Sequence, residues 1–549
     1  MKFLALIKYC LKKFLILIFG ESRSQKIIAS FRSRYIYFFI IKLPSYLSCH
    51  PPIAKSFKSE INLVKLQNFY DSEILTISNR AVELRPAKFK IDEPSKLLFP
   101  NPLFQYSKVD TFGDILTSNN EAFRNKIFRG VAREKVQFFL SLYNRGILQA
   151  LADSGKIVKF KLSDYYTDKF PLILEIDKLR VISSNCWTFS MIKEAAISLL
   201  LIDATLKKYG YAIADGHIYN QAFNHGVPVF FDIGSFIYSS NQTSHFFAYF
   251  KEFFLKTLQF SLLNKEYLQL QYSGIAPKYS NLVSTLNLNL FFEYHRRNSS
   301  KSYYKALKTL FDSPEVKPEY IEAVFSEYPH KSSHEAENCE SRYFTGKAEN
   351  ARLRKIVDLV QIFSSDAKTS VDLAGASGYF SSLLEKTGKF EHLASLEPNE
   401  AAIETGRFLK NNSLIDFYWA DPMHPSWLKF LYDAHVENLS DILKSDICFA
   451  LGVTHHWLLL NNIKLDYIFS TIAKYTKKYV YIEFWPLGLK KTDQAELPPW
   501  YSERWFEKHF HKFFNLLHKE VVDRIKVGGV EKTHSILFIG RVRDECIPT

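Results

Sequence analysis

Between residues 369 and 541, short apolar runs of strand length alternate with longer stretches of helical spacing. We expect strands at 369–374, 392–397, 415–419, 446–451 and 478–484, then an antiparallel pair at 518–525 and 534–541. We expect helices between them at 378–387, 399–411, 425–438, 464–476 and 502–514. Strands that alternate with helices at this period form parallel βαβ units. The pattern predicts an α/β, Rossmann-like sheet of seven strands with a terminal antiparallel hairpin. Ligands bind such sheets at the carboxyl ends of the strands.

The first predicted strand runs into a turn of small residues, Asp372-Leu-Ala-Gly-Ala-Ser-Gly378, before a helix opens. Small residues allow a backbone to lie close to a ligand, and the free N–H groups at a helix start then point at that ligand. An ordinary tight strand-to-helix connection is the alternative interpretation. The candidate binding residues in the turn are Asp372, Ala374, Gly375 and Gly378.

The next strands end in polar residues that suit the same ligand site. Glu397 follows the turn by about twenty residues, where a carboxylate can bind ribose hydroxyls. Asp421 ends the third strand and suits an adenine amino group. His455 and His456 follow the fourth strand, and Glu483 ends the fifth. We therefore expect these side chains at the mouth of one nucleotide-type pocket.

In the N-terminal half, β-like runs at 157–162 and 172–176 alternate with runs of helical pattern at 121–145 and 146–151. A second informative region covers residues 181–240. A long helix of apolar periodicity begins near Thr188 or Ser190, which are residues of the capping type. Asp215 and Asn220 then stand five residues apart, as in a kinase catalytic loop, and Asp232 stands where a metal-binding Asp would follow. The sequence before them shows no glycine-rich phosphate loop and no lysine in a Val-Ala-Ile-Lys context. The pattern favours a kinase-like domain, most simply a degenerate one that no longer transfers phosphate.

The C-terminal motifs resemble class I S-adenosylmethionine-dependent methyltransferases over residues 343–549. Ala450-Leu-Gly-Val-Thr-His-His-Trp-Leu-Leu460 and Ile482-Glu-Phe-Trp-Pro-Leu-Gly488 are similar to a two-part bacterial group that includes nodulation-type methyltransferases. That group also carries a stretch similar to Trp187-Thr-Phe-Ser-Met-Ile-Lys-Glu-Ala-Ala196 and a kinase-like region before the methyltransferase domain. The commonest methyltransferase turn has glycines at positions 374 and 376, where this chain has alanines.

The resemblance implies a function and roles for the residues. S-adenosylmethionine would be the cofactor, and the product would be an O-methylated glycan or related small molecule. The catalytic candidates are His455, His456 and Glu483, because a hydroxyl acceptor benefits from a positioned base; no resident metal is expected. The kinase-like residues Asp215, Asn220 and Asp232 would be a remnant. The alternatives are an active small-molecule kinase with an accessory methyltransferase fold, and a binding protein in which both sites are silent.

The charge of the chain is unevenly distributed. Of a formal +14, residues 1–50 hold nine Lys and Arg against one acid, whereas residues 345–549 hold 26 of each sign. Since the excess lies outside the domain with the chemistry, we expect no nucleic-acid partner. The basic arm could contact an anionic membrane surface peripherally. The interpretation we favour is a helix packed on the protein with its lysines outward.

These observations divide the chain into four segments. They are a basic helical arm at 1–80, an α+β kinase-like domain at 81–328, a polar linker at 329–351 and a methyltransferase domain at 352–549.

Six cysteines without a C-x-x-C pair fit a reducing compartment. Lysines interrupt the apolar N-terminal run, which lacks the features of a signal peptide or a membrane span. We expect a cytoplasmic protein, with peripheral contact at the inner face of the membrane as an option.

Overall fold

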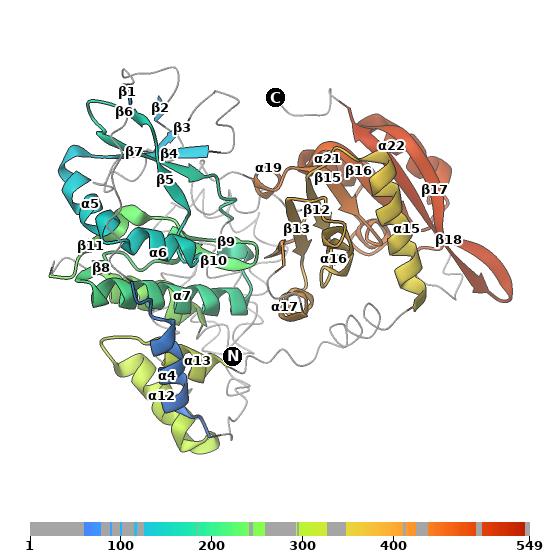
Figure 1. Cartoon of the computed structure of the whole chain (residues 1–549). Helices are drawn as coiled ribbons and strands as arrows, with labels where there is room; N and C mark the ends of the chain where they lie inside the picture. Colours follow the sequence, from blue (N-terminus) through green and yellow to red (C-terminus); the bar gives the residue numbers. More distant parts are fainter. Residues whose placement is uncertain are drawn as a thin grey trace, which may run out of the picture.

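The computed structural model forms two units that lie side by side (Figure 1). It describes residues 60–77, 88–90, 99–100, 115–117, 126–182, 184–240, 245–258, 292–293, 296–326, 347–409, 413–423, 438–489 and 497–543. The N-terminal unit contains the described residues up to 326, and the C-terminal unit begins at 347. The predicted contact of residues 1–50 with a membrane lies outside the described residues. Within the described residues, no helix combines the length and the apolar character that crossing a membrane requires.

The C-terminal unit is built on one seven-stranded sheet. The strands are β12 (Thr369–Leu373), β13 (His392–Glu397), β14 (Ile415–Trp419), β15 (Ser445–Ala450), β16 (Thr476–Phe484), β17 (Phe514–Val527) and β18 (Val530–Val542). Their order is β14-β13-β12-β15-β16-β18-β17, and the first five are parallel. Strand β18 runs antiparallel to both of its neighbours. The predicted α/β sheet of seven strands with a terminal hairpin is confirmed, although the hairpin is longer than predicted.

Helices cover both faces of this sheet. They are α15 (Lys347–Phe363), α16 (Tyr379–Glu385), α17 (Glu400–Leu409), α19 (Leu439–Ile442), α20 (Thr454–Leu459), α21 (Leu465–Tyr475) and α22 (Glu503–Phe513). Side chains of α15, α16 and α17 pack into one buried cluster, and those of α19 to α22 pack into a second cluster on the other face. Helix α15 begins inside the predicted linker, which is therefore shorter at its C-terminal end than 329–351. The predicted helix at 425–438 lies almost wholly outside the described residues.

The N-terminal unit begins with a five-stranded antiparallel sheet. Its order is β2 (Phe99–Pro100), β3 (Ile115–Thr117), β4 (Lys126–Val131), β7 (Leu172–Asp177) and β5 (Phe160–Leu162). Helices α5 (Val136–Asn144) and α6 (Ile147–Asp153) follow β4. The sequence pattern predicts one helix over 121–145, and this prediction is wrong for β4. Strand β4 pairs with β7 from Lys126 to Val131, so long-range pairing overrides the local helical pattern.

The second half of this unit is mainly helical. Its elements include α7 (Phe189–Lys208), the pair β8 (Tyr211–Ile213) with β11 (Phe236–Tyr238), the hairpin β9 (Gln221–Asn224) with β10 (Val227–Phe230), α12 (Lys301–Asp312) and α13 (Pro318–Phe325). Helix α4 (Leu63–Glu73) also belongs here: the N–H groups of Leu75 and Ile77 donate to Thr205 and Tyr209 of the α7 region. This part of the predicted arm therefore packs on the protein.

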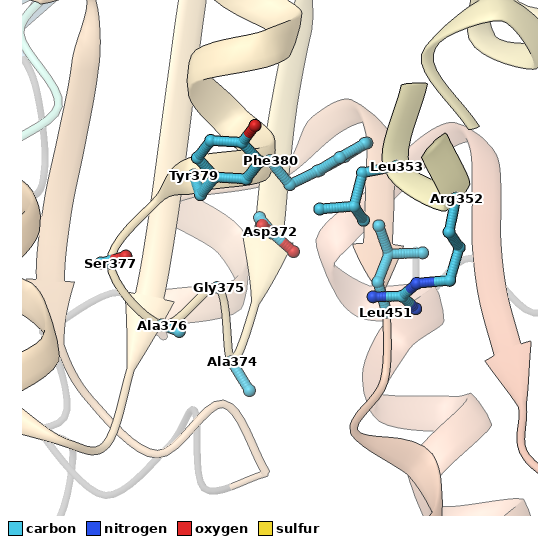
Figure 2. A pocket seen from close by; sticks show the side chains of 10 residues that line it. All are labelled: Arg352, Leu353, Asp372, Ala374, Gly375, Ala376, Ser377, Tyr379, Phe380 and Leu451. Atoms are coloured by element: carbon cyan, nitrogen blue, oxygen red, sulfur yellow. The ribbon is translucent and has the colours of Figure 1, made fainter. Parts of the chain in front are cut away.

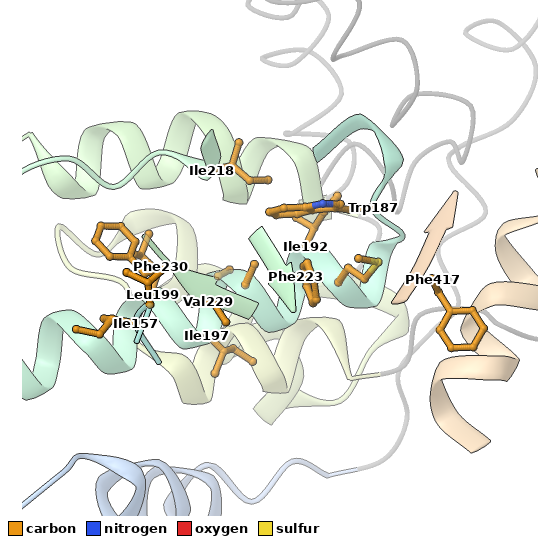
Figure 3. Packing of buried hydrophobic residues seen from close by; sticks show 14 of the residues in the cluster. Ile157, Trp187, Ile192, Ile197, Leu199, Ile218, Phe223, Val229, Phe230 and Phe417 are labelled. Carbon is orange, nitrogen blue, oxygen red and sulfur yellow. The ribbon is translucent and has the colours of Figure 1, made fainter. Parts of the chain in front are cut away.

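One buried cluster connects the two units. It holds Trp187, Ile192 and Phe223 from the N-terminal unit and Phe417 from β14 (Figure 3). The rings of Trp187 and Phe223 meet edge to face with their centroids 4.9 Å apart. Arg407 of α17 lies over the Phe223 ring, 5.2 Å from its centroid, and also pairs with Glu194 of α7. The units therefore share apolar burial as well as polar contacts.

Carboxylates of α17 cap the amino end of α7. The N-cap residue Thr188 makes no side-chain cap hydrogen bond. Instead the N–H of Phe189 donates to Glu400 at 3.1 Å, and the N–H of Ser190 donates to Glu404 at 2.9 Å. Both carboxylates are buried, and a negative charge at a helix amino end is favourable. The expected local cap is thus replaced by one from the other unit.

A second polar link joins β14 to the β9–β10 turn. Buried Asp416 accepts the N–H of Gly226 at 2.9 Å and lies 2.8 Å from Nε2 of His392. Arg180 donates to Nδ1 of His392 at 2.7 Å, so Nε2 carries the proton that His392 donates to Asp416. Burial lowers the pKa of His392, which agrees with a neutral ring in this chain of contacts.

We predict that Glu400→Ala lowers the free energy of unfolding by about 1–2 kcal/mol, because it leaves a buried N–H of α7 without an acceptor. Urea titration of the full chain measures this. The control is Glu391→Ala, because the carboxylate of Glu391 is exposed and lies 3.8 Å from Lys368. The free energy of unfolding of this variant should stay within about 0.5 kcal/mol of the wild-type value. Equal stability of the two variants would contradict the capping role.

Candidate functional site

The turn after β12 is held in an unusual backbone conformation. Ala374 and Ala376 have φ angles of 59° and 49°, and Gly378, the N-cap of α16, has 70°. The left-handed region favours glycine, and an alanine there costs roughly 1–2 kcal/mol. The two alanines that depart from the commonest methyltransferase turn therefore occupy the positions where glycine would be least strained. The turn keeps a glycine-type geometry without the glycines.

The glycines that remain are required by close packing. A Cβ on Gly375 would lie 2.4 Å from the hydroxyl of Ser395 and 2.8 Å from Oδ2 of Asp372. A Cβ on Gly378 would lie 2.5 Å from the Phe417 ring. Gly378 thus serves the helix start and the packing of α16 against β14.

A hollow of about 370 Å³, open to solvent, lies beside this turn (Figure 2). Its lining comes from the turn, from α15 and α16, and from the residue after β15: Arg352, Leu353, Asp372, Ala374, Gly375, Ala376, Ser377, Tyr379, Phe380 and Leu451. The buried hydroxyl of Ser377 has no hydrogen-bond partner within the described part of the chain, so it can still bind a ligand. The predicted residues Asp372, Ala374 and Gly375 meet here.

Asp372 is the acidic group of this hollow. Its side chain is 3% exposed, and burial, together with the charges of Glu397 and Glu483, raises the pKa of Asp372 to about 8. A cation bound beside it would favour the ionised form. The hollow therefore suits a ligand with positive charge.

Glu397 braces the turn from the end of β13. Its Oε2 accepts the N–H of Ala376 and its Oε1 accepts the N–H of Asn399, both at 2.9 Å. Both bonds come from backbone N–H groups, so Glu397 holds the turn against the end of β13. Asp421 accepts the N–H of Met423 at 2.9 Å. Glu397 contacts the turn and Asp421 follows β14, and neither residue lines the hollow.

Glu483 is fully buried and forms an ion pair with the partly buried Arg352. Nη1 of Arg352 is 2.7 Å from Oε1 of Glu483 and also contacts Oε2. The hydroxyl of Ser535 donates to the same Oε1 at 2.7 Å. Since Arg352 lines the hollow, Glu483 acts on the site by holding this guanidinium in place. The sequence offered no signal for Arg352, which precedes the first strand in a polar helix.

The two adjacent histidines have different environments. His455 is 2% exposed and stacks on Trp485 with ring centroids 4.5 Å apart, whereas His456 is solvent-exposed. Burial and the neighbouring His456, His534 and Arg352 lower the pKa of His455 to about 3. Partial desolvation of its ring also lowers the pKa of His456. Both rings are therefore neutral at pH 7, and His455 is a weak proton acceptor.

Sequence reasoning missed a third histidine in this region. His534 of β18 is 3% exposed, and its ring centroid is 4.3 Å from that of Trp485. Its Nδ1 lies 2.6 Å from Oδ2 of Asp523 on β17. The sequence did carry a signal for His534, because it lies at the start of the last predicted strand. That strand runs antiparallel to the others, so its start lies at the carboxyl edge of the sheet.

The kinase-like residues form a separate polar cluster in the N-terminal unit. Asp215 contacts His217 at 2.9 Å, and Asp232 contacts Arg129 of β4 at 3.2 Å. The N–H of Phe231 donates to the carbonyl of Asn220, which brings Asn220 beside Asp232. Asn220 and Asp232 are therefore neighbours, whereas Asp215 follows β8, which pairs with β11. Arg129 was missed because the sequence pattern predicts a helix where β4 forms.

No family model and no curated protein sequence matches the chain. Solved structures overlap with about two fifths of it. The PH0226 protein of Pyrococcus horikoshii OT3 shows 16% identity and TM-score 0.30, covering 39% of this chain and 100% of its own. A Burkholderia thailandensis 1,6-didemethyltoxoflavin-N1-methyltransferase with bound S-adenosylhomocysteine shows 12% identity and TM-score 0.28, and the match covers 40% of this chain and 93% of that protein. A Clostridium acetobutylicum S-adenosylmethionine-dependent methyltransferase shows 13% identity and TM-score 0.28, and the match covers 38% of this chain and 97% of that protein.

We predict that Ala376→Gly raises the free energy of unfolding by about 0.5–1 kcal/mol. Relief of the left-handed strain, about 1–2 kcal/mol, exceeds the added backbone entropy of glycine, about 0.5–1 kcal/mol. Denaturant titration measures the change. Ala402→Gly in α17, where φ is not positive, is the control and should lower stability by about 1 kcal/mol. Destabilisation by both variants would contradict the strained conformation.

The raised pKa of Asp372 predicts a pH dependence of stability. The folded state holds this proton up to a pH of about 8, whereas the unfolded chain releases it near the ordinary aspartate pKa of 3.8. The contribution of Asp372 is thus fully present below pH ~4 and is lost as pH rises toward 8, by ~1.4 kcal/mol per pH unit. Urea titrations of wild type and Asp372→Asn at pH 6 and 7 should show this extra slope in wild type only. Parallel slopes would contradict a buried, protonated Asp372.

Proposed function

We propose that the chain is an S-adenosylmethionine-dependent methyltransferase. The observation that carries the proposal is the left-handed turn between β12 and α16, which opens on a hollow containing a buried carboxyl group. The order of the seven-stranded sheet supports it, because this turn lies at the carboxyl edge, beside the end of the neighbouring strand β15. The hollow suits a cationic ligand, and the cofactor carries a sulfonium and an ammonium group.

The residues present fit this cofactor. Asp372 would face a positive group, and the buried Ser377 hydroxyl and the backbone of Gly375 and Ala376 would lie against the ligand. Glu397 is the expected contact for ribose hydroxyls, and Asp421 is the expected contact for adenine. When bound, the cofactor supplies an electrophilic methyl group. The chain itself contributes orientation, since displacement at this carbon requires the acceptor in line with it.

The acceptor we propose is a hydroxyl of a glycan or related small molecule. Trp485 supports this, because its half-buried indole, next to His455, offers an aromatic surface of the kind that sugar rings pack against. Incubating cell-envelope and cytosolic extracts with radiolabelled S-adenosylmethionine and the protein identifies the fraction that becomes labelled.

We propose that the N-terminal unit is kinase-like and serves as a scaffold. Its five-stranded sheet is followed by α7, and Asp215 and Asp232 follow β8 and β10 at the spacing of a kinase catalytic region. The ion pair of Asp232 with Arg129 puts a guanidinium against the carboxylate that would hold a metal, which disfavours phosphate transfer. Its contacts with α17 and β14 instead support the C-terminal unit.

Isothermal titration with S-adenosylmethionine tests the proposal. We expect the full chain to bind it, and Asp372→Asn to weaken binding at least tenfold, a loss of ~1.4 kcal/mol, through the lost carboxylate. Glu397→Gln should also weaken binding, because it disturbs both the turn and the expected ribose contact.

The control is Asp446→Asn. Asp446 accepts the N–H groups of Lys368 and Thr369 at the opposite, amino edge of the same sheet, so this variant should keep wild-type affinity. NAD is titrated in parallel as the competing ligand of such turns. Binding of NAD without S-adenosylmethionine, or binding of neither, would remove the methyltransferase proposal.

A further inference from the structure

His534 lies at the reactive edge of the C-terminal sheet. Strand β18 runs antiparallel to β16, and Ile536 pairs with Phe484, the last residue of β16. His534 therefore stands just beyond the carboxyl end of β16. Glu483 and the hollow beside the β12 turn lie at this same edge. The ring is thus on the side of the sheet where ligands of this fold bind.

Asp523 fixes the protonation of this histidine. The two residues lie on the paired strands β17 and β18, where Asp523 is opposite Ser535. The carboxylate accepts from Nδ1 of His534 across 2.6 Å, so the neutral ring keeps its proton on Nδ1 and a lone pair on Nε2. The same contact would stabilise the imidazolium that forms if Nε2 takes up a proton.

Nε2 of His534 has no hydrogen-bond partner among the described residues, although it is buried. A buried acceptor without a donor is unfavourable, because it has lost its hydrogen bonds to water. A ligand hydroxyl that donated to Nε2 would remove this cost. The ring of His534 is held in one tautomer and its acceptor Nε2 is unpaired within the described residues. This combination indicates a site for a ligand O–H group.

Trp485 connects this nitrogen to the hollow. Its ring centroid is 4.3 Å from that of His534, and Arg352, which lines the hollow, has its Cζ 5.7 Å from the indole centroid. His455 stacks on the same indole, but within the described residues its Nδ1 is unpaired and its ring makes no ion pair with a carboxylate. Of the two buried histidines that contact Trp485, His534 is therefore the one with a group that can balance an imidazolium.

We propose that His534, oriented by Asp523, is the general base that deprotonates an aliphatic hydroxyl of the methyl acceptor, an inference that rests on the proposed function. The hydroxyl oxygen forms the new O–C bond as the C–S bond breaks and leaves its electron pair on sulfur. The hydroxyl proton moves to Nε2 of His534. The positive charge lost from the sulfonium reappears on the imidazolium, beside the Asp523 carboxylate. In this proposal the neutral ring of His455 lines the acceptor site and takes no proton.

The first test needs no acceptor. Nitrogen-15 NMR of the imidazole rings of the full chain, assigned with His534→Gln, should show His534 with its proton on Nδ1 at pH 8. Asp523→Asn should weaken that preference. A wild-type His534 with its proton on Nε2 would overturn the proposal, because that nitrogen could not accept another proton.

The second test is the pH dependence of methyl transfer from radiolabelled S-adenosylmethionine to the extract fraction that the wild type labels. His534→Gln should lower the rate by ~10²-fold or more without changing cofactor affinity. Asp523→Asn should move the acidic limb of the rate profile to lower pH, because the imidazolium loses its counter-charge. A purely structural role would not move that limb. Wild-type rate and pH profile in His534→Gln would overturn the proposal.

The matched control is His518→Gln. His518 lies on the same hairpin, 3.2 Å from Glu520, and stacks on Phe363 away from the hollow. The rate of methyl transfer by His518→Gln should therefore stay within about twofold of the wild-type rate. Isothermal titration separates the two ideas. If the wild type does not bind S-adenosylmethionine, the proposed function fails. If the wild type binds S-adenosylmethionine and His534→Gln transfers methyl groups as fast as the wild type, only the role of His534 fails.

Discussion

The hydrogen bond from the N–H of Ala376 to Glu397 organises the C-terminal unit. It joins the turn after β12 to the end of β13 and keeps Ala376 in a left-handed conformation that alanine disfavours. The other oxygen of Glu397 accepts from Asn399, immediately before α17. Since α17 supplies the carboxylates that cap α7, the same residue links the turn, the sheet and the neighbouring unit.

The site combines groups that would be unfavourable if buried alone. Asp372 keeps a proton because it is buried and two other carboxylates lie near it, and Glu483 is balanced by Arg352 and a hydroxyl. Burying such groups costs free energy that only specific partners offset. Their concentration at one edge of the sheet, beside a solvent-open hollow, is typical of a functional site. The strained alanines at the same edge agree with this interpretation.

The two units are joined by charge as well as by apolar packing. Glu400 and Glu404 replace a local helix cap, and Asp416 holds the β9–β10 turn of the N-terminal unit. These carboxylates are buried, so removing one leaves its N–H partner without water to replace it. The N-terminal unit, in which Asp232 pairs with Arg129, is therefore tied to the sheet of its neighbour by buried hydrogen bonds.

The alternating pattern of residues 369–541 determined the α/β sheet and placed Asp372, Glu397 and Asp421 at the carboxyl ends of its strands, because strand and helix periods are local properties of the sequence. The same local reasoning failed at β4, where pairing with β7 decided the conformation. Only the tertiary structure paired Arg352 with Glu483, 131 residues apart, and brought His534 to Trp485. The roles of His455 and His534 could not be separated in the sequence, because the environment of each ring comes from strands and helices distant in the chain. Periodicity specifies which face of an element is buried, whereas the partners on that face are fixed only when the elements pack.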